Sequence, residues 1–238
     1  MNSVDAIRLH IQGLLNSFRE PKSHKIHRTL PFPPQTTLIG FAGAALGLSE
    51  GTLWKEFKSL RVAVVDVSKT SDLGGAGKAE DLVKYKKYKD SDIESSIYVR
   101  ELLYKPEYMV YYASEKKDIL ERLFNAFLNP VYALSLGRDD ELITIKSVEK
   151  INLKPIESGE FEETILPFDP VEEGFEIDMS SQRYFEPYST VLLPSTFIVK
   201  NGVREPAGFK KYIFLKNLKI VLNKDGGFTD GKYNFFFL

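Results

Sequence analysis

The chain of 238 residues is predicted to have an α+β fold, in which a βαββαβ unit at residues 1–154 is followed by a smaller β-rich domain at residues 155–238. Segments with strand and helix periodicity alternate in this order before residue 155, and only short strand-like runs separated by turns follow it. A polar stretch at residues 68–95 has no core-forming period and predicts an exposed, protruding hairpin. The order of the first domain is that of a ferredoxin-like unit, which also underlies RNA-recognition (RRM-like) modules.

The strands are indicated by alternation and by β-branched or aromatic residues. Ile7, Leu9 and Ile11 alternate with polar residues, the pattern of a half-buried strand. Further strands of the first domain are expected at residues 61–67, 96–104, 108–113 and 142–148. Because only Lys105-Pro106-Glu107 separates residues 96–104 from 108–113, we expect these two runs to form a hairpin. In the second domain, strands are expected at residues 190–200, 211–222 and 232–238.

The first helix is expected to begin near Leu38, after a proline-rich loop. Prolines at 31, 33 and 34 hold that loop extended, and Thr36 and Thr37 are candidate N-cap residues. Three glycines within this helix cost roughly 1 kcal/mol each relative to alanine, which indicates a close packing or binding contact. Its N-terminus offers unpaired N–H groups and partial positive charge, which suit a phosphate. Residues 51–58 predict a short helical segment and residues 119–128 a second amphipathic helix.

Composition limits the classes of protein and of site. No apolar run approaches the roughly 20 residues of a membrane helix, and Met1 opens no signal-peptide pattern. We therefore expect a cytoplasmic protein with no membrane contact. Cysteine is absent, which excludes disulfides, thiol nucleophiles and Cys-ligated zinc. The three histidines show no metal-ligand spacing, so we expect neither a metal nor a cofactor.

Charge is strongly segregated along the chain although the net charge is only −1. Residues 16–35 contain four basic residues and one acid, and residues 200–224 contain seven basic residues and one acid. Residues 155–182 contain nine acids and no Lys or Arg. A local basic patch matters more for binding a polyanion than the total charge does, so an RNA partner is compatible with this composition. The acidic segment is either a solvated loop or a surface for a basic partner.

Several motifs resemble, in order, those of one known family. They are Ser17-Phe18-Arg19-Glu20-Pro21, residues 31–40 (PFPPQTTLIG), residues 44–48 (AALGL), Arg100-Glu101-Leu102-Leu103-Tyr104, residues 106–112 (PEYMVYY), Asn129-Pro130 and Leu136-Gly137-Arg138. This series resembles the CRISPR-associated Cas5 family of the RAMP class, which is built on the ferredoxin-like unit. The match spans residues 16–138, and no specific motif follows.

The resemblance implies a subunit of a type I CRISPR surveillance complex, Cascade, in antiviral defence. Such a subunit holds the 5′ handle of the crRNA and packs between the large subunit and the first Cas7-type backbone subunit, and it meets target DNA only through the complex. In that family an excursion at the position of residues 68–95 forms a thumb-like projection that touches guide RNA and the adjacent backbone subunit. Residues 84–89 (KYKKYK) alternate cations with aromatics, a combination that suits single-stranded RNA.

The residues predicted to bind RNA lie in the basic loop, at the start of the first helix, in the hairpin and after the second helix. They are Phe18, Arg19, Lys22, His24, Lys25, His27, Arg28, Thr36, Thr37, Lys84, Lys86, Lys87 and Arg138. For three of these residues there is a structural alternative to RNA binding. Phe18 is then a buried aromatic, Arg19 forms a structural ion pair, and Arg138 is neutralised locally by the acids at 139–141.

The alternative function is a metal-independent endoribonuclease that processes precursor crRNA, as one branch of the resembled family does. Such an enzyme needs a general base and a general acid, for which the candidates are His24, His27 and Tyr112. A third alternative is a protein-interaction module that uses the acidic residues 157–178. The Gly74–Lys78 stretch (GGAGK) lacks the spacing of a phosphate loop and is expected at the tip of the hairpin.

Overall fold

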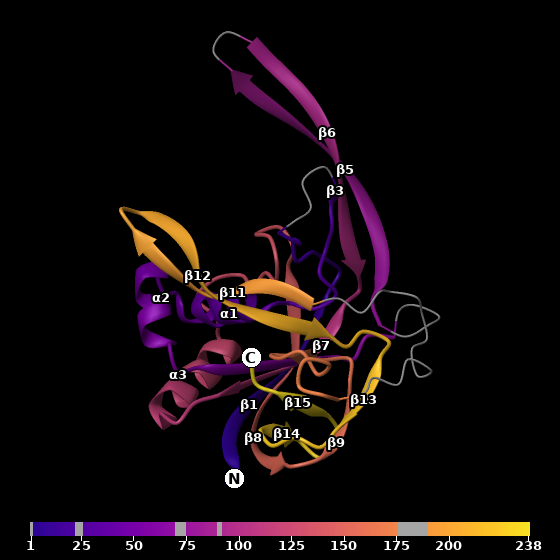
Figure 1. The fold of residues 1–238 in the computed structure, drawn as a ribbon. Coiled ribbons are helices and arrows are strands. Elements are labelled where there is room, and N and C mark those ends of the chain that lie inside the picture. The colour runs from indigo at the N-terminus through magenta and orange to yellow at the C-terminus, as the bar shows by residue number, and fades with distance from the viewer. Residues whose placement is uncertain (1, 22–25, 70–74, 90–91, 176–189) are drawn as a thin grey trace.

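The computed structural model describes residues 2–21, 26–69, 75–89, 92–175 and 190–238. It is strand-rich, with few helices (Figure 1). The central six-stranded sheet has the order β15-β14-β8-β1-β7-β4, and each neighbouring pair is antiparallel. Its strands are β1 (Val4–Gly13), β4 (Arg61–Asp66), β7 (Glu107–Ala113), β8 (Ile143–Ile156), β14 (Gly227–Thr229) and β15 (Asn234–Phe236). The strands expected at 7–11, 61–67, 108–113 and 142–148 are therefore confirmed.

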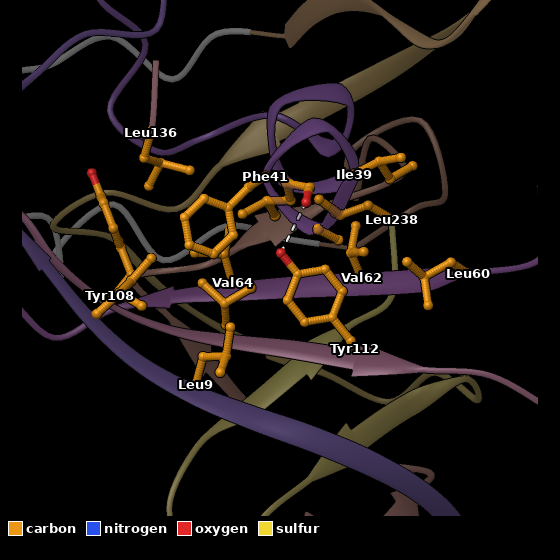
Figure 2. Close-up of a cluster of buried hydrophobic side chains, with 14 of the residues drawn as sticks. Leu9, Ile39, Phe41, Leu60, Val62, Val64, Tyr108, Tyr112, Leu136 and Leu238 are labelled. Atoms are coloured by element: carbon orange, nitrogen blue, oxygen red, sulfur yellow. Dashed lines mark hydrogen bonds between the residues drawn. The ribbon is translucent and has the colours of Figure 1, made fainter. Parts of the chain in front are cut away.

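The helices α1 (Gln35–Leu46), α2 (Glu50–Glu56) and α3 (Lys117–Leu128) pack on one side of this sheet (Figure 1). The largest core cluster lies between the sheet and the helices. In it the Tyr112 hydroxyl, on a fully buried side chain of β7, donates a hydrogen bond to the Leu38 carbonyl of α1 at 2.8 Å (Figure 2). The same ring lies 5.3 Å from that of Phe127 on α3. Tyr112 of β7 thus contacts both α1 and α3 in the core.

Helix α1 begins at Gln35, earlier than its apolar periodicity suggests. Its N-cap is Pro34, with no side-chain capping hydrogen bond, so Thr36 and Thr37 lie inside the first turn and the N-cap prediction is wrong. Proline serves here because its fixed φ suits the helix entry. The helix glycines mostly contact protein: a Cβ on Gly43 would lie 2.6 Å from Leu53 of α2. Gly47 is the left-handed C-cap, with φ of 68°. Only Gly40 has open space beside it.

A long two-stranded arm projects from the body (Figure 1). It consists of β5 (Gly77–Lys89) and β6 (Asp92–Tyr104), paired along their full length. At the base, β2 (Leu15–Asn16) pairs antiparallel and β3 (Ile26–His27) parallel with β6. The expected protruding hairpin is present, and its regular strand structure extends through Tyr104.

Two local predictions about this arm are wrong. Residues 105–107 do not join a hairpin, because β6 pairs with β5, β2 and β3 whereas β7 pairs with β1 and β4. Lys105, at a φ of 49°, instead turns the chain from the arm into the central sheet. Of the glycine-rich stretch, Gly74 lies outside the described residues and Gly77 pairs with Tyr104 at the base of the arm, far from its tip.

The residues after 155 form short sheets and complete the central one. The remaining strands are β9 (Gly159–Glu162), β10 (Ile165–Leu166), β11 (Thr190–Lys200), β12 (Val203–Phe214) and β13 (Lys219–Leu222). The C-terminal Leu238 belongs to the main core cluster, and its carbonyl oxygen accepts a hydrogen bond from Gln35 Nε2 at 3.1 Å. Strands and side chains from both sides of residue 154 contribute to the central sheet and to the main core cluster. The division into two domains at this residue stays a prediction.

The acidic and basic segments pair with each other. Lys219 lies 2.8 Å from Glu160, Lys224 lies 2.6 Å from Glu173, and Lys211 also bonds Glu172. Much of the charge segregation seen in the sequence is thus balanced inside the molecule. Within the part of the chain that the structure describes, no helix has both the length and the apolar character to cross a membrane.

Candidate nucleic-acid interface

A basic cavity of about 300 Å³ lies where the start of α1, the base of the arm and the turn after Leu136 meet. It is lined by Ser17, Phe18, Arg19, His27, Arg28, Thr37, Arg100, Gly137 and Arg138. The sequence predicted Arg19, His27, Arg28, Thr37 and Arg138 as RNA-binding residues, and the fold brings all of them together. We call this cavity the basic pocket.

Backbone pairing between residues 18–20 and 28–30 positions two of the arginines. Leu30 N donates to the Phe18 carbonyl at 2.7 Å, Glu20 N donates to the Arg28 carbonyl at 2.9 Å, and Arg19 and Thr29 form a β-bridge. The Thr29 hydroxyl accepts from Phe18 N at 2.8 Å. This short ribbon leaves the side chains of Arg19 and Arg28 exposed beside the same cavity.

The buried carboxylate of Glu141 places the third arginine. It accepts hydrogen bonds from Ser17 N at 2.7 Å, from the Ser17 hydroxyl at 2.5 Å and from Arg138 N at 2.9 Å. Gly137, at a φ of 115°, lets the turn approach so closely that a Cβ there would lie 2.4 Å from the Ser17 carbonyl oxygen. The turn that carries Arg138 is therefore locked onto the ribbon that carries Arg19.

The pocket is electropositive. Among the described residues, no carboxylate forms an ion pair with Arg19, Arg28 or Arg138. Of the acids next to Arg138, Glu141 turns inward, Asp140 lies 4.0 Å from Arg100, and Asp139 forms no ion pair with Arg138. Burial, followed by the nearby charges of Arg19, Arg138 and Arg100, lowers the pKa of His27 below 6.5. A neutral imidazole and three arginines without carboxylate partners favour an anionic ligand.

The N-terminus of α1 adds to this field. Thr37 lines the pocket from the first turn, which contains no acidic residue and no side-chain cap. The partial positive charge at this helix end is therefore left uncompensated and acts in the same direction as the arginines. Thr36, half-buried in the same turn, does not line the pocket.

An aromatic row leads from the pocket onto the arm. The His27 ring lies 4.0 Å from the Tyr98 ring, which lies 5.5 Å from that of Tyr85. In the β5–β6 register Tyr98 is opposite Val83 and Tyr85 is opposite Ser96, so both tyrosines share the arm face that also carries Arg100. Arg100, Tyr98 and Glu141 were missed as site residues because only the register of the arm and the buried turn bring them to the pocket.

Other predicted residues lie elsewhere. Phe18 was predicted to contact RNA, with a buried aromatic as the alternative; it is 2% exposed and its ring is 6.3 Å from that of Tyr108, so the structure favours the alternative. Tyr112 is fully buried against Leu38 and cannot act as a catalytic residue. Lys84 and Lys86 are exposed on the opposite face of the arm from Arg100, and Lys87 lies in β5. Lys22, His24 and Lys25 lie outside the described residues.

Comparison with known proteins gives one family. The sequence profile of the CRISPR-associated protein family Cas5 matches residues 6–191. No curated protein matches the sequence.

Solved structures show the same fold at low sequence identity. A chain of a CRISPR RNA-guided surveillance complex is 14% identical, with 92% of this chain and 90% of that chain covered and a TM-score of 0.54. A CRISPR protein from Archaeoglobus fulgidus is 10% identical, with 97% and 98% covered and a TM-score of 0.57. Another structure, described as a Cas protein, is 21% identical, has a TM-score of 0.39, and is covered over only 58% of its length. The first two of these comparisons show that the mixed, strand-rich α/β fold is shared with CRISPR proteins.

Proposed function

The chain belongs to the Cas5 family of CRISPR-associated proteins, and we propose that it is a non-catalytic subunit of a type I surveillance complex that holds the 5′ handle of the crRNA in the basic pocket. The observation that carries this proposal is the convergence of Arg19, Arg28 and Arg138, without carboxylate partners among the described residues, at the start of α1. Arginines bind phosphate oxygens in a bidentate manner, and a helix N-terminus adds N–H donors and positive potential. Together they fit a sharply bent phosphate backbone.

The aromatic row supplies the second half of RNA recognition. Single-stranded RNA is bound by stacking unpaired bases on aromatic rings beside a cationic track. His27, Tyr98 and Tyr85 continue directly from the pocket along the arm. We propose that the backbone of the handle enters the pocket while neighbouring bases stack along this row.

Within the fold, we read β8-β1-β7-β4 with α1 and α3 as a ferredoxin-like unit. The projecting arm suits the bridging role, because it reaches beyond the body (Figure 1). We propose that it contacts a neighbouring Cas7-type backbone subunit. The large subunit is the second proposed partner, target DNA is met through the complex, and the proposed compartment is the cytoplasm.

The proposal is tested by filter binding of handle RNA to the purified chain over a salt series. Neutralising phosphates releases counterions, so affinity should fall steeply between roughly 50 and 200 mM salt. The double variant Arg19→Ala with Arg28→Ala should bind at least tenfold more weakly and show a salt slope smaller by about one to two units. Arg122→Ala with Lys150→Ala removes the same charge from ion pairs with Glu56 and Glu121 and should bind as the wild type does. A flat salt response, or equal loss in both double variants, contradicts the proposal.

One observation favours the alternative, a metal-independent endoribonuclease. His27 has a pKa lowered by burial and the arginines and lies in the pocket, so at neutral pH its imidazole is unprotonated and suited to accept a 2′-hydroxyl proton. Incubating the chain with repeat RNA separates the two functions. Specific cleavage that disappears in His27→Ala but persists in His10→Ala establishes the enzyme. RNA retained uncut supports the binding subunit.

A further inference from the structure

A second concave surface lies on the body, away from the basic pocket. It is a groove of about 720 Å³ between α2, the adjoining part of α1 and strand β11. Figure 1 shows the β11–β12 hairpin extending past α2 on this side of the molecule. None of the groove's lining residues lines the basic pocket.

The walls of the groove are apolar. Trp54 of α2 and Phe197 of β11 face each other with ring centroids 5.2 Å apart, and Ile39 and Phe57 contribute buried side chains behind them. At the mouth, Ile198 of β11 is 48% exposed. An apolar side chain that enters here exchanges water for hydrocarbon and aromatic surface, which stabilises a complex in proportion to the apolar area buried.

The groove also contains one buried donor without an acceptor. The Trp54 indole Nε1 is inaccessible to water and has no hydrogen-bond partner. A buried indole N–H normally finds a partner, and leaving it unpaired is destabilising. A main-chain carbonyl oxygen of a bound peptide would satisfy it once the side chains that cover the indole nitrogen shift to admit the peptide.

The rim is positively charged. Lys55, Lys58 and Lys210 line the groove, are exposed, and form no ion pair with any described residue. The acid in the lining, Glu50, is already bonded to Arg204 at 2.8 Å. Three free ammonium groups around an apolar groove complement a ligand that is apolar in its centre and acidic at its ends.

We propose that this groove binds an acidic, partly apolar peptide segment of a partner protein. An apolar side chain of the segment lies between α2 and β11, a main-chain carbonyl accepts the Trp54 N–H, and carboxylates meet the three lysines. The apolar walls and the single unpaired donor favour a peptide over RNA, whose backbone needs several cationic and N–H contacts. This inference does not depend on the RNA site.

Trp54 is the only tryptophan in the chain, so its fluorescence reports directly on the groove. The probe is a pool of end-blocked octapeptides in which Asp or Glu alternates with Leu, Ile or Phe. The comparison pool carries Lys or Arg in place of the acids. We expect a saturable change in Trp54 emission with the acidic pool and a response at least fivefold weaker with the basic pool.

Charge-reversal variants distinguish binding in the groove from non-specific attraction between opposite charges. Lys55→Glu with Lys58→Glu should weaken binding of the acidic pool at least tenfold, whereas Lys116→Glu with Lys117→Glu, at the start of α3, should leave it unchanged. Trp54→Phe keeps an aromatic ring in the groove but removes the N–H donor, so the affinity measured by calorimetry should be lower than that of the wild type. The proposal is overturned by an absent or non-saturable response, by equal effects of the two lysine pairs, or by a single-stranded RNA that displaces the peptides. It is also overturned if emission depends on protein concentration alone, which indicates a second copy as the occupant.

Discussion

Glu141 holds Ser17, 124 residues away in the sequence, by two hydrogen bonds from the serine: one from the backbone N–H at 2.7 Å and one from the hydroxyl at 2.5 Å. Asn16 Nδ2 adds bonds to the carbonyl oxygens of Leu136 and Glu141 at 2.7 and 3.1 Å. These contacts join the turn that carries Arg138 to the ribbon that carries Arg19. The spacing of the arginines in the basic pocket therefore depends on a carboxylate that is only 4% exposed.

Glu141→Gln should weaken RNA binding although residue 141 touches no ligand. The amide keeps the shape of the carboxylate but not its charge, so the bonds from Ser17 N and Arg138 N become weaker neutral ones, and the bond with the Ser17 hydroxyl must reverse its direction. We expect a loss of about 1–3 kcal/mol in the free energy of unfolding, measured by urea denaturation, and a several-fold loss of affinity. Glu121→Gln, at an exposed ion pair with Lys150, should change neither quantity appreciably.

Gly137→Ala tests whether the close approach of the turn is needed. A Cβ at residue 137 would lie 2.2 Å from Glu141 Oε2 and 2.4 Å from the Ser17 carbonyl, so the turn must move. Gly174→Ala is a matched control, because Gly174 also has a positive φ, 85°, but no atom lies within 4 Å of its Cβ position. Both variants should lose about 1–2 kcal/mol from backbone strain, and only Gly137→Ala should also lose handle affinity. Equal affinities in the two variants would show that the turn does not position the pocket.

Much of the fold could be predicted because local periodicity reports burial. Residues 108–113 form a central strand whose side chains are mostly buried, and residues 117–128 form a helix with one apolar face. Strand pairing could not be predicted in the same way. Lys105-Pro106-Glu107 is a valid turn sequence, yet β7 lies between β1 and β4, with Tyr112 buried under α1 and Tyr108 buried against Phe18, and β6 runs into the arm.

Apart from Arg138, which the family resemblance indicated, the candidate site was predictable only where its residues are close in sequence. Arg19, Arg28 and Thr37 share one basic stretch that leads into a helix, so charge and helix periodicity were enough to group them. Tyr85 and Tyr98 become neighbours only through the register of a long hairpin, and Arg100 joins them from the same face. Phe18 shows the converse error, since its place beside Arg19 led to a predicted RNA contact although its ring belongs to the core.

Handle affinity should rise as the pH falls through the range in which His27 titrates. Burial and three arginines lower the pKa of free His27 below 6.5, so the imidazole is neutral at neutral pH. A bound phosphate reverses that field and raises the pKa, and binding therefore takes up a proton. Affinity measured from about pH 7.5 down to about pH 5.5 should increase in the wild type. The dependence should be flat in His27→Gln and kept in His10→Gln. A pH dependence unchanged by His27→Gln would contradict this linkage.

Tyr98→Ser should weaken binding of single-stranded RNA by about tenfold, because loss of one stacking ring costs roughly 1–3 kcal/mol. The matched control is Tyr88→Ser, since Tyr88 is 75% exposed on the opposite face of the same arm. Filter binding with handle RNA measures both variants, and circular dichroism checks that the arm keeps its strands. If Tyr88→Ser is the more damaging change, the bases lie on the other face of the arm and the proposed path is wrong.

Glu163 should make the protein less stable as the pH rises. Burial and the nearby charge of Asp66 raise the pKa of Glu163 from 4.5 to about 7, and its Oε2 is buried without a hydrogen-bond partner. Between these two pKa values the folded state keeps a proton that the unfolded state has lost, so the free energy of unfolding falls across this range by up to about 3 kcal/mol. Glu163→Gln removes this titration and should reduce the pH dependence measured by urea denaturation at about pH 5 and about pH 8; Asp66, whose pKa is also raised by burial, contributes to what remains. The exposed neighbour provides the control, since Glu162→Gln should keep the slope of the wild type; equal slopes in all three proteins would mean that Glu163 ionises normally in the folded state.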